Sequence, residues 1–214
     1  MENIKAAIFD LDGTLMDSMW FWSEIDEVYL KGRGIDPVPE DYLLAIAHLG
    51  AYETAVYTAK RFGFPDTPEE MIAEWQGMAM DFYENRVELK DGAYEYLKML
   101  KEKGVKLAVA TANDEELYVP ALRHTGIADM FDAVVNVNEV ERKKGFPDIY
   151  LLACEKMGVK AEESVVFEDI LLGITGAEAG GFRTVAVADI TSERDRDRII
   201  AVADKFITSF RELL

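Results

Sequence analysis

Cysteine is nearly absent from this chain. Cys154 is the only cysteine among 214 residues, so a disulfide within the chain is excluded, and a reducing compartment suits such a protein. Histidine is also rare, with two residues in all. Because His48 and His124 stand far apart, they form no local group of zinc ligands. We therefore assign both histidines, like Cys154, to structural positions.

Positive charge is scarce as well. The chain has 23 lysine and arginine residues against 41 aspartate and glutamate residues, which gives a formal net charge of −18. Such a surface repels nucleic acid and anionic membranes, so we expect neither as a partner. Long apolar runs are missing too, and neither a membrane span nor a signal peptide is expected. The cytoplasm is therefore the predicted location.

The hydrophobic residues that make up half of the chain are arranged in short runs. Five runs are rich in β-branched residues and apolar at nearly every position, which is typical of buried parallel strands. They cover residues 4–9, 105–110, 134–137, 164–167 and 184–188. Helical patterns over residues 93–103 and 147–157 stop at Gly104 and Gly158. Strands that alternate with helices predict an α/β fold with a Rossmann-like, mostly parallel sheet.

Residues 17–87 interrupt this alternation, because no convincing strand pattern occurs in them. Helical patterns replace it, at residues 19–31, 39–49, 52–62 and 68–85. The last begins with a capping box, Thr67-Pro-Glu-Glu70, with proline at the first helical position. We therefore predict an α/β core formed by residues 1–16 and 88–214, and an all-helical insertion formed by residues 17–87.

Polar residues with useful chemistry follow three of the predicted strands. They are Asp10 and Asp12 after the first strand, Thr111 and Asn113 at the second, and Glu168 and Asp169 at the fourth. Ligands of open α/β sheets bind beyond the carboxyl ends of the strands, so these groups converge if the strands are neighbours. Carboxylates packed together need a cation. Hard oxygen ligands without a nearby histidine or cysteine cluster favour Mg²⁺ over zinc.

The same groups suit phosphoryl chemistry. A carboxylate such as Asp10 can act as a covalent nucleophile and carry an aspartyl-phosphate. Gly13 permits a tight turn with exposed N–H groups that face phosphate oxygens, and the Thr111 hydroxyl can bind the same anion. A fixed positive charge is also needed. Either Lys143 or Lys144, before a loop that enters a helix, could supply it.

Taken in order, these motifs resemble those of the haloacid dehalogenase superfamily of hydrolases. The first motif is Asp10-Leu-Asp-Gly-Thr-Leu-Met-Asp-Ser18, and the others are Thr111-Ala-Asn113, Lys144-Gly-Phe-Pro-Asp148 and Glu168-Asp169. The resemblance covers essentially the whole chain, and it is to the branch with a helical cap inserted after the first motif. That branch includes phosphoglycolate phosphatase-like enzymes and β-phosphoglucomutase. The fold that it implies is a Rossmann-like parallel sheet core with an all-helical cap.

The resemblance implies a role for each matched residue. Asp10 would attack phosphorus and bind Mg²⁺. Asp12 would act as general acid and then general base, and its main-chain carbonyl would be a second metal ligand. Asp169 would ligate Mg²⁺ directly, with support from Glu168. The phosphoryl group would be held by Gly13, Thr111, Asn113 and Lys144.

Two positions depart from the usual pattern of the family. Gly145 stands where a proline usually follows the motif lysine, and Ile170 replaces a common serine after Glu168-Asp169. The second change could loosen the support of the metal site. Neither change removes a primary catalytic group.

The first helical pattern of the insertion contains a cluster of aromatic residues. At helical spacing, the face that predicts the core of the cap carries Phe21, Trp22, Ile25, Val28 and Tyr29. Trp20 falls instead on the polar face. A large aromatic side chain there, just after the catalytic loop, predicts a contact with substrate, and packing against a neighbouring cap helix is the alternative.

The implied function is that of a Mg²⁺-dependent phosphatase, which hydrolyses a small phosphorylated metabolite through an aspartyl-phosphate. One alternative is a sugar-phosphate mutase resembling β-phosphoglucomutase. That enzyme type has a histidine where Trp22 stands, and an arginine in a cap loop that the sequence near Gly50 lacks. Dehalogenases lack the second aspartate that Asp12 provides, and phosphonatases need a cap lysine that is not obvious here. A catalytically idle binding or regulatory protein on the same fold is a further alternative, and the substrate and oligomeric state stay open.

Overall fold

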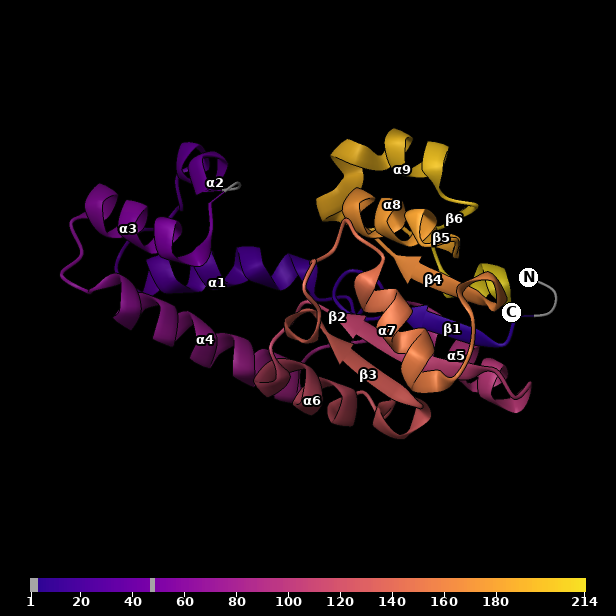
Figure 1. The fold of residues 1–214 in the computed structure, drawn as a ribbon. Coiled ribbons are helices and arrows are strands. Elements are labelled where there is room, and N and C mark those ends of the chain that lie inside the picture. The colour runs from indigo at the N-terminus through magenta and orange to yellow at the C-terminus, as the bar shows by residue number, and fades with distance from the viewer. Residues whose placement is uncertain (1–3, 47–48) are drawn as a thin grey trace. The chain divides into compact units, whose positions relative to one another are not determined.

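A computed structural model of the chain describes residues 4–46 and 49–214. Over these residues, six parallel strands form one sheet in the order β3-β2-β1-β4-β5-β6 (Figure 1). The strands are β1 (Ala6–Phe9), β2 (Lys106–Thr111), β3 (Ala133–Asn136), β4 (Ser164–Glu168), β5 (Arg183–Val187) and β6 (Lys205–Ile207). The apolar runs expected to be strands correspond to β1 through β5, so the predicted parallel α/β sheet is confirmed.

Helices cover both faces of this sheet. They are α5 (Ala93–Glu102), α6 (Glu115–His124), α7 (Asp148–Met157), α8 (Leu171–Ala179) and α9 (Arg196–Val202). Because successive strand residues point to opposite faces, Ile8 of β1 packs in one cluster with Ile149 and Tyr150 of α7. The ring of Phe9 lies on the other face, 6.5 Å from that of Tyr96 on α5. A sheet buried on both faces explains why its strands are apolar at nearly every residue.

A second compact unit, Phe21–Tyr83, consists of helices and their connections wherever it is described. We call it the helical unit; its helices are α1 (Met19–Gly32), α2 (Glu40–Ile46), α3 (Ala51–Phe62) and α4 (Pro68–Asn85). The described parts of Met1–Trp20 and Glu84–Leu214 form the other unit, which we call the sheet unit. The helix expected over residues 39–49 reaches positions 47 and 48, which lie outside the described residues, and so does the structural assignment of His48.

The core of the helical unit is built from aromatic rings. Phe21 of α1 stacks on Phe82 of α4 with ring centroids 3.8 Å apart, and Tyr29 meets Trp75 edge-on at 5.5 Å. Phe21, Ile25 and Tyr29 follow one another at a spacing of four residues, and all three are buried. This part of the amphipathic pattern of α1 is therefore confirmed.

Two residues expected on that buried face are exposed instead. Trp22 is 41% exposed and Val28 is 48% exposed. Residues four apart on a helix are not exactly in line, because a turn takes 3.6 residues. The buried stripe therefore winds around the helix between Phe21 and Tyr29, and Val28 lies to one side of it. Trp22 follows Phe21 directly and so lies to the side of the stripe, and its large indole is only partly covered where its ring lies 6.5 Å from that of Phe21.

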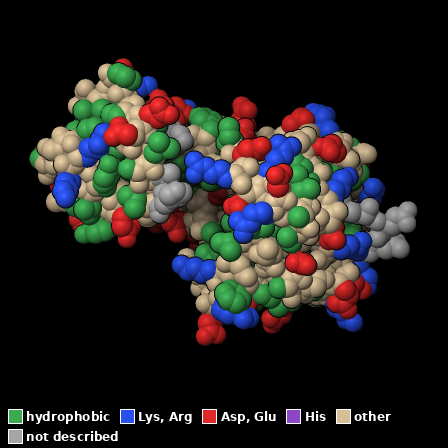
Figure 2. Space-filling model, turned by 90° about the horizontal axis from the view of Figure 1, so that it is seen from above, with side chains coloured by type: hydrophobic (Ala, Val, Ile, Leu, Met, Phe, Trp, Pro, Cys, Tyr) green, Lys and Arg blue, Asp and Glu red, His purple; other side chains and the backbone are tan. Residues whose placement is uncertain are grey.

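The surface carries charged side chains of both signs. On the face seen in Figure 2, acidic and basic side chains are interspersed, so basic groups there lie among acidic neighbours. This arrangement agrees with a chain that has 41 acidic and 23 basic residues. Within the described residues, every helix is too short or too polar to cross a bilayer.

Candidate active site

Three neighbouring strands bring the predicted site residues to one edge of the sheet. β1 lies between β2 and β4, and all three are parallel, so their carboxyl ends meet. Asp10 follows β1, Thr111 closes β2, and Glu168 closes β4 with Asp169 next to it. All four residues are buried. The expected convergence of polar groups is therefore present at this edge.

Carboxylates form the centre of the site. Asp10, Glu168 and Asp169 each offer one oxygen, and these oxygens lie within 4.8 Å of one another. We call them the carboxylate cluster. Buried carboxylate oxygens at this spacing are a donor set for a hard divalent cation.

The carboxylate cluster also holds an ammonium group. Lys144 Nζ contacts Asp10 Oδ1 and lies 2.6 Å from Glu168 Oε1. Burial lowers the pKa of Lys144, but Asp10 and Glu168 raise it by more, so this pKa stays above its ordinary value and the side chain stays charged. Lys143 is exposed. The structure thus distinguishes two adjacent lysines that were equivalent in the residue pattern.

A single ammonium group leaves the carboxylate cluster with excess negative charge. Burial raises the pKa of Asp10 well above its ordinary value; Lys144 opposes this rise, and Glu168 and Asp169 add to it. The pKa of Asp169 is raised as well, first by burial and then by Glu168. Ionised carboxylates are therefore disfavoured here unless a cation joins them.

Glu168 is held by the groups around it. Tyr150 donates a hydrogen bond to Glu168 Oε1 at 2.9 Å. Gly173 on α8 leaves room for the carboxylate, because a Cβ there would lie 2.2 Å from Glu168 Cδ. Glu168 Oε2 is buried and has no hydrogen-bond partner among the described residues. An orphaned buried oxygen of this kind fits a metal ligand.

The turn after β1 encloses Asp169 from the other side. Gly13 has a φ of 79°, and a Cβ at this position would lie 2.4 Å from Asp169 Oδ2, so both backbone angle and space require glycine. The N–H of Gly13 donates to the main-chain oxygen of Met16 at 3.0 Å, so Gly13 shapes the loop while its own N–H is engaged. Thr14 Oγ1 donates to Asp169 Oδ1 at 3.1 Å and to Asp10 Oδ2 at 3.4 Å.

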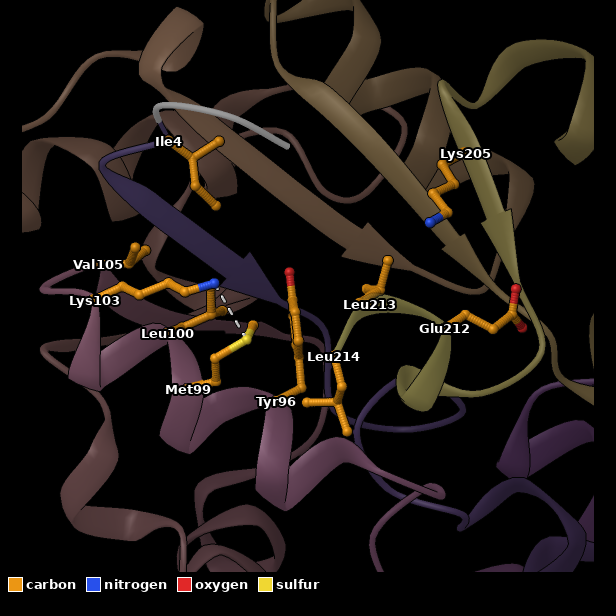
Figure 3. Close-up of a pocket in the computed structure, with 10 residues that line it drawn as sticks. All are labelled: Ile4, Tyr96, Met99, Leu100, Lys103, Val105, Lys205, Glu212, Leu213 and Leu214. Carbon is orange, nitrogen blue, oxygen red and sulfur yellow. Dashed lines mark hydrogen bonds between the residues drawn. The ribbon is translucent and has the colours of Figure 1, made fainter.

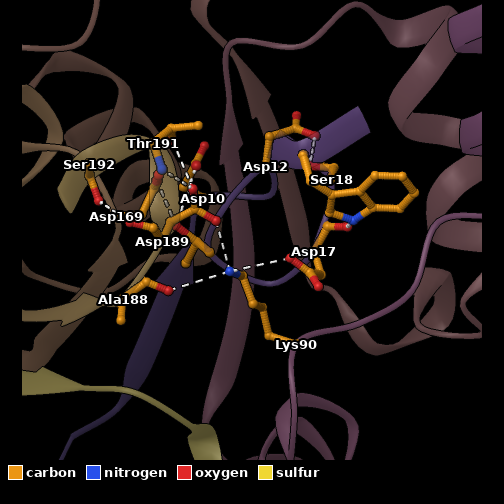
Figure 4. Close-up of polar contacts among 12 residues, drawn as sticks. Asp10, Asp12, Asp17, Ser18, Lys90, Asp169, Ala188, Asp189, Thr191 and Ser192 are labelled. Carbon is orange, nitrogen blue, oxygen red and sulfur yellow. Dashed lines mark hydrogen bonds and ion pairs between the residues drawn. The ribbon is translucent and has the colours of Figure 1, made fainter. Parts of the chain in front are cut away.

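Asp12 has a different environment from the carboxylate cluster. Ser18 Oγ donates to Asp12 Oδ1 at 2.6 Å, as Figure 4 shows. Asn113 Nδ2 donates to Asp12 Oδ2 at 2.9 Å, and the Asn113 N–H donates to Thr111 Oγ1 at 3.0 Å. Both carboxylate oxygens of Asp12 therefore have a partner, and the plane of the group is set by two separate segments.

Some residues of the site were not singled out in the sequence. Thr14 and Ser18 lie inside the first motif, which is the one signal that could have identified them. Tyr150 had no such signal, because its partner Glu168 is 18 residues away.

Trp20 is 43% exposed, and its Nε1 donates to the main-chain oxygen of Asp17 at 2.8 Å. This hydrogen bond orients the indole beside the segment that leads into α1. The contact of Trp20 with substrate stays a prediction.

A cavity lies at the opposite edge of the sheet. It measures about 520 Å³ and includes Ile4, which precedes β1, and Val105, which precedes β2 (Figure 3). Parallel strands place Asp10 and Thr111 at their other ends. The cavity is therefore separate from the candidate active site.

The profile of the haloacid dehalogenase-like hydrolase family matches residues 7–187 of this chain. Over 182 residues the chain is 28% identical to the phosphorylated carbohydrates phosphatase of Thermotoga maritima, with 85% of this chain and 84% of that protein covered. Over 201 residues it is 31% identical to the protein SUPPRESSOR OF QUENCHING 1, chloroplastic, of Arabidopsis thaliana. That alignment covers 89% of this chain but only 18% of the longer plant protein.

A solved structure from Thermotoga maritima, which carries the name β-phosphoglucomutase, superposes on this chain with a TM-score of 0.84 at 26% identity. The superposition covers 95% of this chain and 94% of that one. Fold, motif order and family profile agree over most of the sequence. The chain therefore belongs to the haloacid dehalogenase-like hydrolases.

Proposed function

We propose that this protein is a Mg²⁺-dependent phosphatase that hydrolyses a small phosphomonoester through an aspartyl-phosphate. The observation that carries the proposal is the placement of Asp10, whose buried carboxylate contacts Lys144 and belongs to the carboxylate cluster. A carboxylate nucleophile, a fixed cation and a metal donor set are the parts that phosphoryl transfer to a side chain needs. A relative named as a phosphatase of phosphorylated carbohydrates supports the choice of reaction.

In this proposal Asp10 is the nucleophile and Asp12 is the general acid and base. An oxygen of Asp10 forms a bond to phosphorus as the bond from phosphorus to the ester oxygen breaks. Asp12 gives a proton to that departing oxygen, and then takes a proton from the water that hydrolyses the aspartyl-phosphate. The hydrogen bonds from Ser18 and Asn113 suit this role, because they hold the Asp12 carboxylate in one orientation.

Mg²⁺ would be held by Asp10, Glu168, Asp169 and the main-chain carbonyl of Asp12. The fit rests on the spacing of the carboxylate oxygens and on the orphaned Oε2 of Glu168. When bound, the ion neutralises the carboxylates and the negative charge of the phosphoryl group.

The phosphoryl group would be bound by Lys144, Thr111, Asn113 and the loop that Gly13 shapes. Lys144 supplies the fixed positive charge. Thr111 Oγ1 accepts a hydrogen bond from the Asn113 N–H, so its own proton remains to donate to a phosphoryl oxygen. These contacts orient phosphorus toward Asp10.

Residues 17–87 would serve as the cap, and residues 1–16 and 88–214 as the catalytic core. The substrate in this proposal is a small phosphorylated metabolite in the cytoplasm, and Trp20 would contact it. An acidic chain with a net charge of −18 suits neither nucleic acid nor an anionic membrane as partner.

A sugar-phosphate mutase is the second candidate, because a structure that carries the name β-phosphoglucomutase superposes on the chain. Trp22 stands where the resemblance places a histidine in that enzyme type, which favours hydrolysis. A mutase would depend on a bisphosphate activator and would yield an isomerised product instead of free phosphate. A catalytically idle binding protein would give neither product.

Phosphate release from a panel of small phosphate esters, with Mg²⁺ or with EDTA, tests the proposal. We expect release that needs Mg²⁺ and that falls by at least ~10²-fold in Lys144→Ala, since a fixed positive charge on the phosphoryl group is lost. Lys143→Ala is the matched control, because Lys143 is the exposed neighbour of Lys144. Full release in EDTA, or equal losses in the two lysine variants, would contradict the assignment.

A further inference from the structure

Lys90 lies where the chain has returned to the sheet unit, which resumes at Glu84. Its Nζ is 2.8 Å from Asp189 Oδ2, 3.3 Å from the main-chain oxygen of Ala188 and 3.5 Å from Asp17 Oδ1 (Figure 4). Asp17 belongs to the segment that leads into α1, and Ala188 follows β5. One ammonium group therefore joins three parts of the sheet unit: residues 15–18, which lead into α1 and which we call the outgoing segment; residues 88–90, which we call the returning segment; and the end of β5.

Asp189, the closest partner of Lys90, is held in one orientation by its surroundings. Its side chain is 2% exposed, and its Oδ1 accepts hydrogen bonds from the Thr191 N–H at 2.9 Å and from Thr191 Oγ1 at 2.7 Å. Its Oδ2 is left for Lys90. A buried ion pair with these additional hydrogen bonds has a defined geometry, and loss of the lysine would leave a buried charge without its counterion.

The outgoing and returning segments are also joined through their backbones. The Lys90 N–H donates to the main-chain oxygen of Leu15 at 2.8 Å, and the Asp17 N–H donates to that of Glu88 at 2.9 Å. The two segments therefore move together. The residue after Asp17 is Ser18, whose hydroxyl donates to Asp12 Oδ1 at 2.6 Å.

We propose that Lys90 is a positioning residue for Asp12, and that it acts through the outgoing segment and Ser18. This inference rests on the phosphatase function proposed above. Without the Lys90 side chain, Asp17 loses its tie to the end of β5, and the adjacent Ser18 shifts with it. A misplacement of ~1 Å at a reacting group can lower a rate by about 10²-fold.

The proposal has a kinetic signature that a general loss of stability lacks. An alkyl phosphate has a poor leaving group and needs the proton of Asp12, whereas p-nitrophenyl phosphate releases a stable phenolate and needs it little. The ratio kcat/KM reports the steps up to departure of the leaving group, so it excludes the later hydrolysis of the aspartyl-phosphate. Displacement of Asp12 therefore lowers kcat/KM far more for the alkyl ester than for the aryl ester.

The experiment measures kcat/KM for both esters with the full chain in saturating Mg²⁺. Lys90→Met is the test variant. Ser18→Ala shows the effect of removing the hydrogen bond to Asp12 directly. In Lys90→Met alone, the buried Asp189 carboxylate has no counterion, which can destabilise the fold. The double variant Lys90→Met with Asp189→Asn removes that charge as well. Lys101→Met is the matched control, because its half-exposed ion pair with Asp132, at 3.1 Å, links α5 to the segment before β3.

We expect Lys90→Met and the double variant to lower kcat/KM for the alkyl ester by at least ~10-fold, while the aryl ester changes by no more than about twofold. Ser18→Ala should show the same selectivity, and Lys101→Met should change neither value. An equal fall for both esters, or no fall at all, would overturn the proposal. A wild-type protein that releases phosphate from no ester of the panel described above would refute the phosphatase function itself.

Discussion

Asp26 on α1 is a carboxylate inside the helical unit that the proposed chemistry does not use. Burial raises its pKa from 3.8 to about 6, and a hydrogen bond with Tyr42 opposes the rise. The Tyr42 hydroxyl lies 2.9 Å from Thr58 Oγ1, which donates to the main-chain oxygen of Thr54 at 2.7 Å. Burial outweighs the hydrogen bond with Tyr42, so the neutral form of Asp26 is favoured up to about pH 6.

The raised pKa determines the sign of the pH dependence. Asp26 loses its proton near pH 3.8 in the unfolded chain and near pH 6 in the folded chain, so between these values the folded state binds more protons. Stability therefore falls as the pH rises through this window. A difference of about two pH units corresponds to at most ~3 kcal/mol, and water that reaches the half-buried side chain reduces that figure.

Asp26→Asn tests this reasoning, because the amide keeps the shape and can donate to Tyr42 without titrating. We expect the variant to be more stable than wild type by ~1–3 kcal/mol at pH 7.5, and by about a third of that gain at pH 4.5. Urea unfolding followed by tryptophan fluorescence, to which Trp22 and Trp75 of the helical unit contribute, measures the difference.

The matched control is Asp41→Asn on α2, whose carboxylate is 69% exposed and lies 2.7 Å from Arg61. Loss of an exposed ion pair should change stability by less than ~1 kcal/mol at either pH. An Asp26→Asn protein that is less stable than wild type at pH 7.5, or whose advantage does not change with pH, would refute the assignment of Asp26 as a destabilised carboxylate.

Further predictions concern the active site. Gly173→Ala places a Cβ 2.2 Å from Glu168 Cδ, so we expect an overpacking cost of ~1–3 kcal/mol in thermal unfolding, and an unchanged midpoint would contradict this packing. Tyr150→Phe removes the hydrogen bond to Glu168 Oε1 and should weaken Mg²⁺ binding by ~10- to 100-fold in calorimetry, whereas equal affinity would show that the hydroxyl does not support the site. Asp12→Asn should lower kcat by ~10²–10⁴-fold with stability retained, and turnover near that of wild type would exclude its acid–base role.

Much of the sheet and the polar residues at its edge could be predicted from the sequence, because both leave local signals. Buried parallel strands are apolar at nearly every residue, and β1 through β5 show that pattern. The groups at the strand ends, such as Asp10 and Glu168, follow those runs directly. Because the strands pair in parallel, these groups meet at one edge of the sheet. Their convergence can be predicted from that pairing alone.

Other elements lacked a local signal. β6 has three residues, of which only Ile207 is buried, so no apolar run marks it. α6 contains Pro120, which is normally a sign against a helix interior. α8 contains Gly173 and Gly176, which lower helix propensity. They occur there because a Cβ at Gly173 would meet Glu168 and a Cβ at Gly176 would lie 3.0 Å from the backbone of Gly145.

Contacts between distant segments were also beyond the sequence pattern. Lys90 and Asp189 are 99 residues apart, and neither belongs to a motif. Their ion pair depends on where β5 ends relative to the segment that returns from the helical unit. The exposure of Trp22 likewise depends on which side chains cover α1, and its helical angle alone predicted burial.

The identity of the nucleophile is tested most directly by trapping the phosphoenzyme. Protein mixed with an ester that it hydrolyses and with Mg²⁺, quenched in acid within one turnover and digested for mass spectrometry, should carry a phosphoryl group on the peptide that contains Asp10. Hydroxylamine should remove that group, Asp10→Asn should carry none, and Lys143→Ala should carry as much as wild type. A phosphoryl group on another residue, or turnover in Asp10→Asn after deamidation has been excluded, would contradict the covalent mechanism.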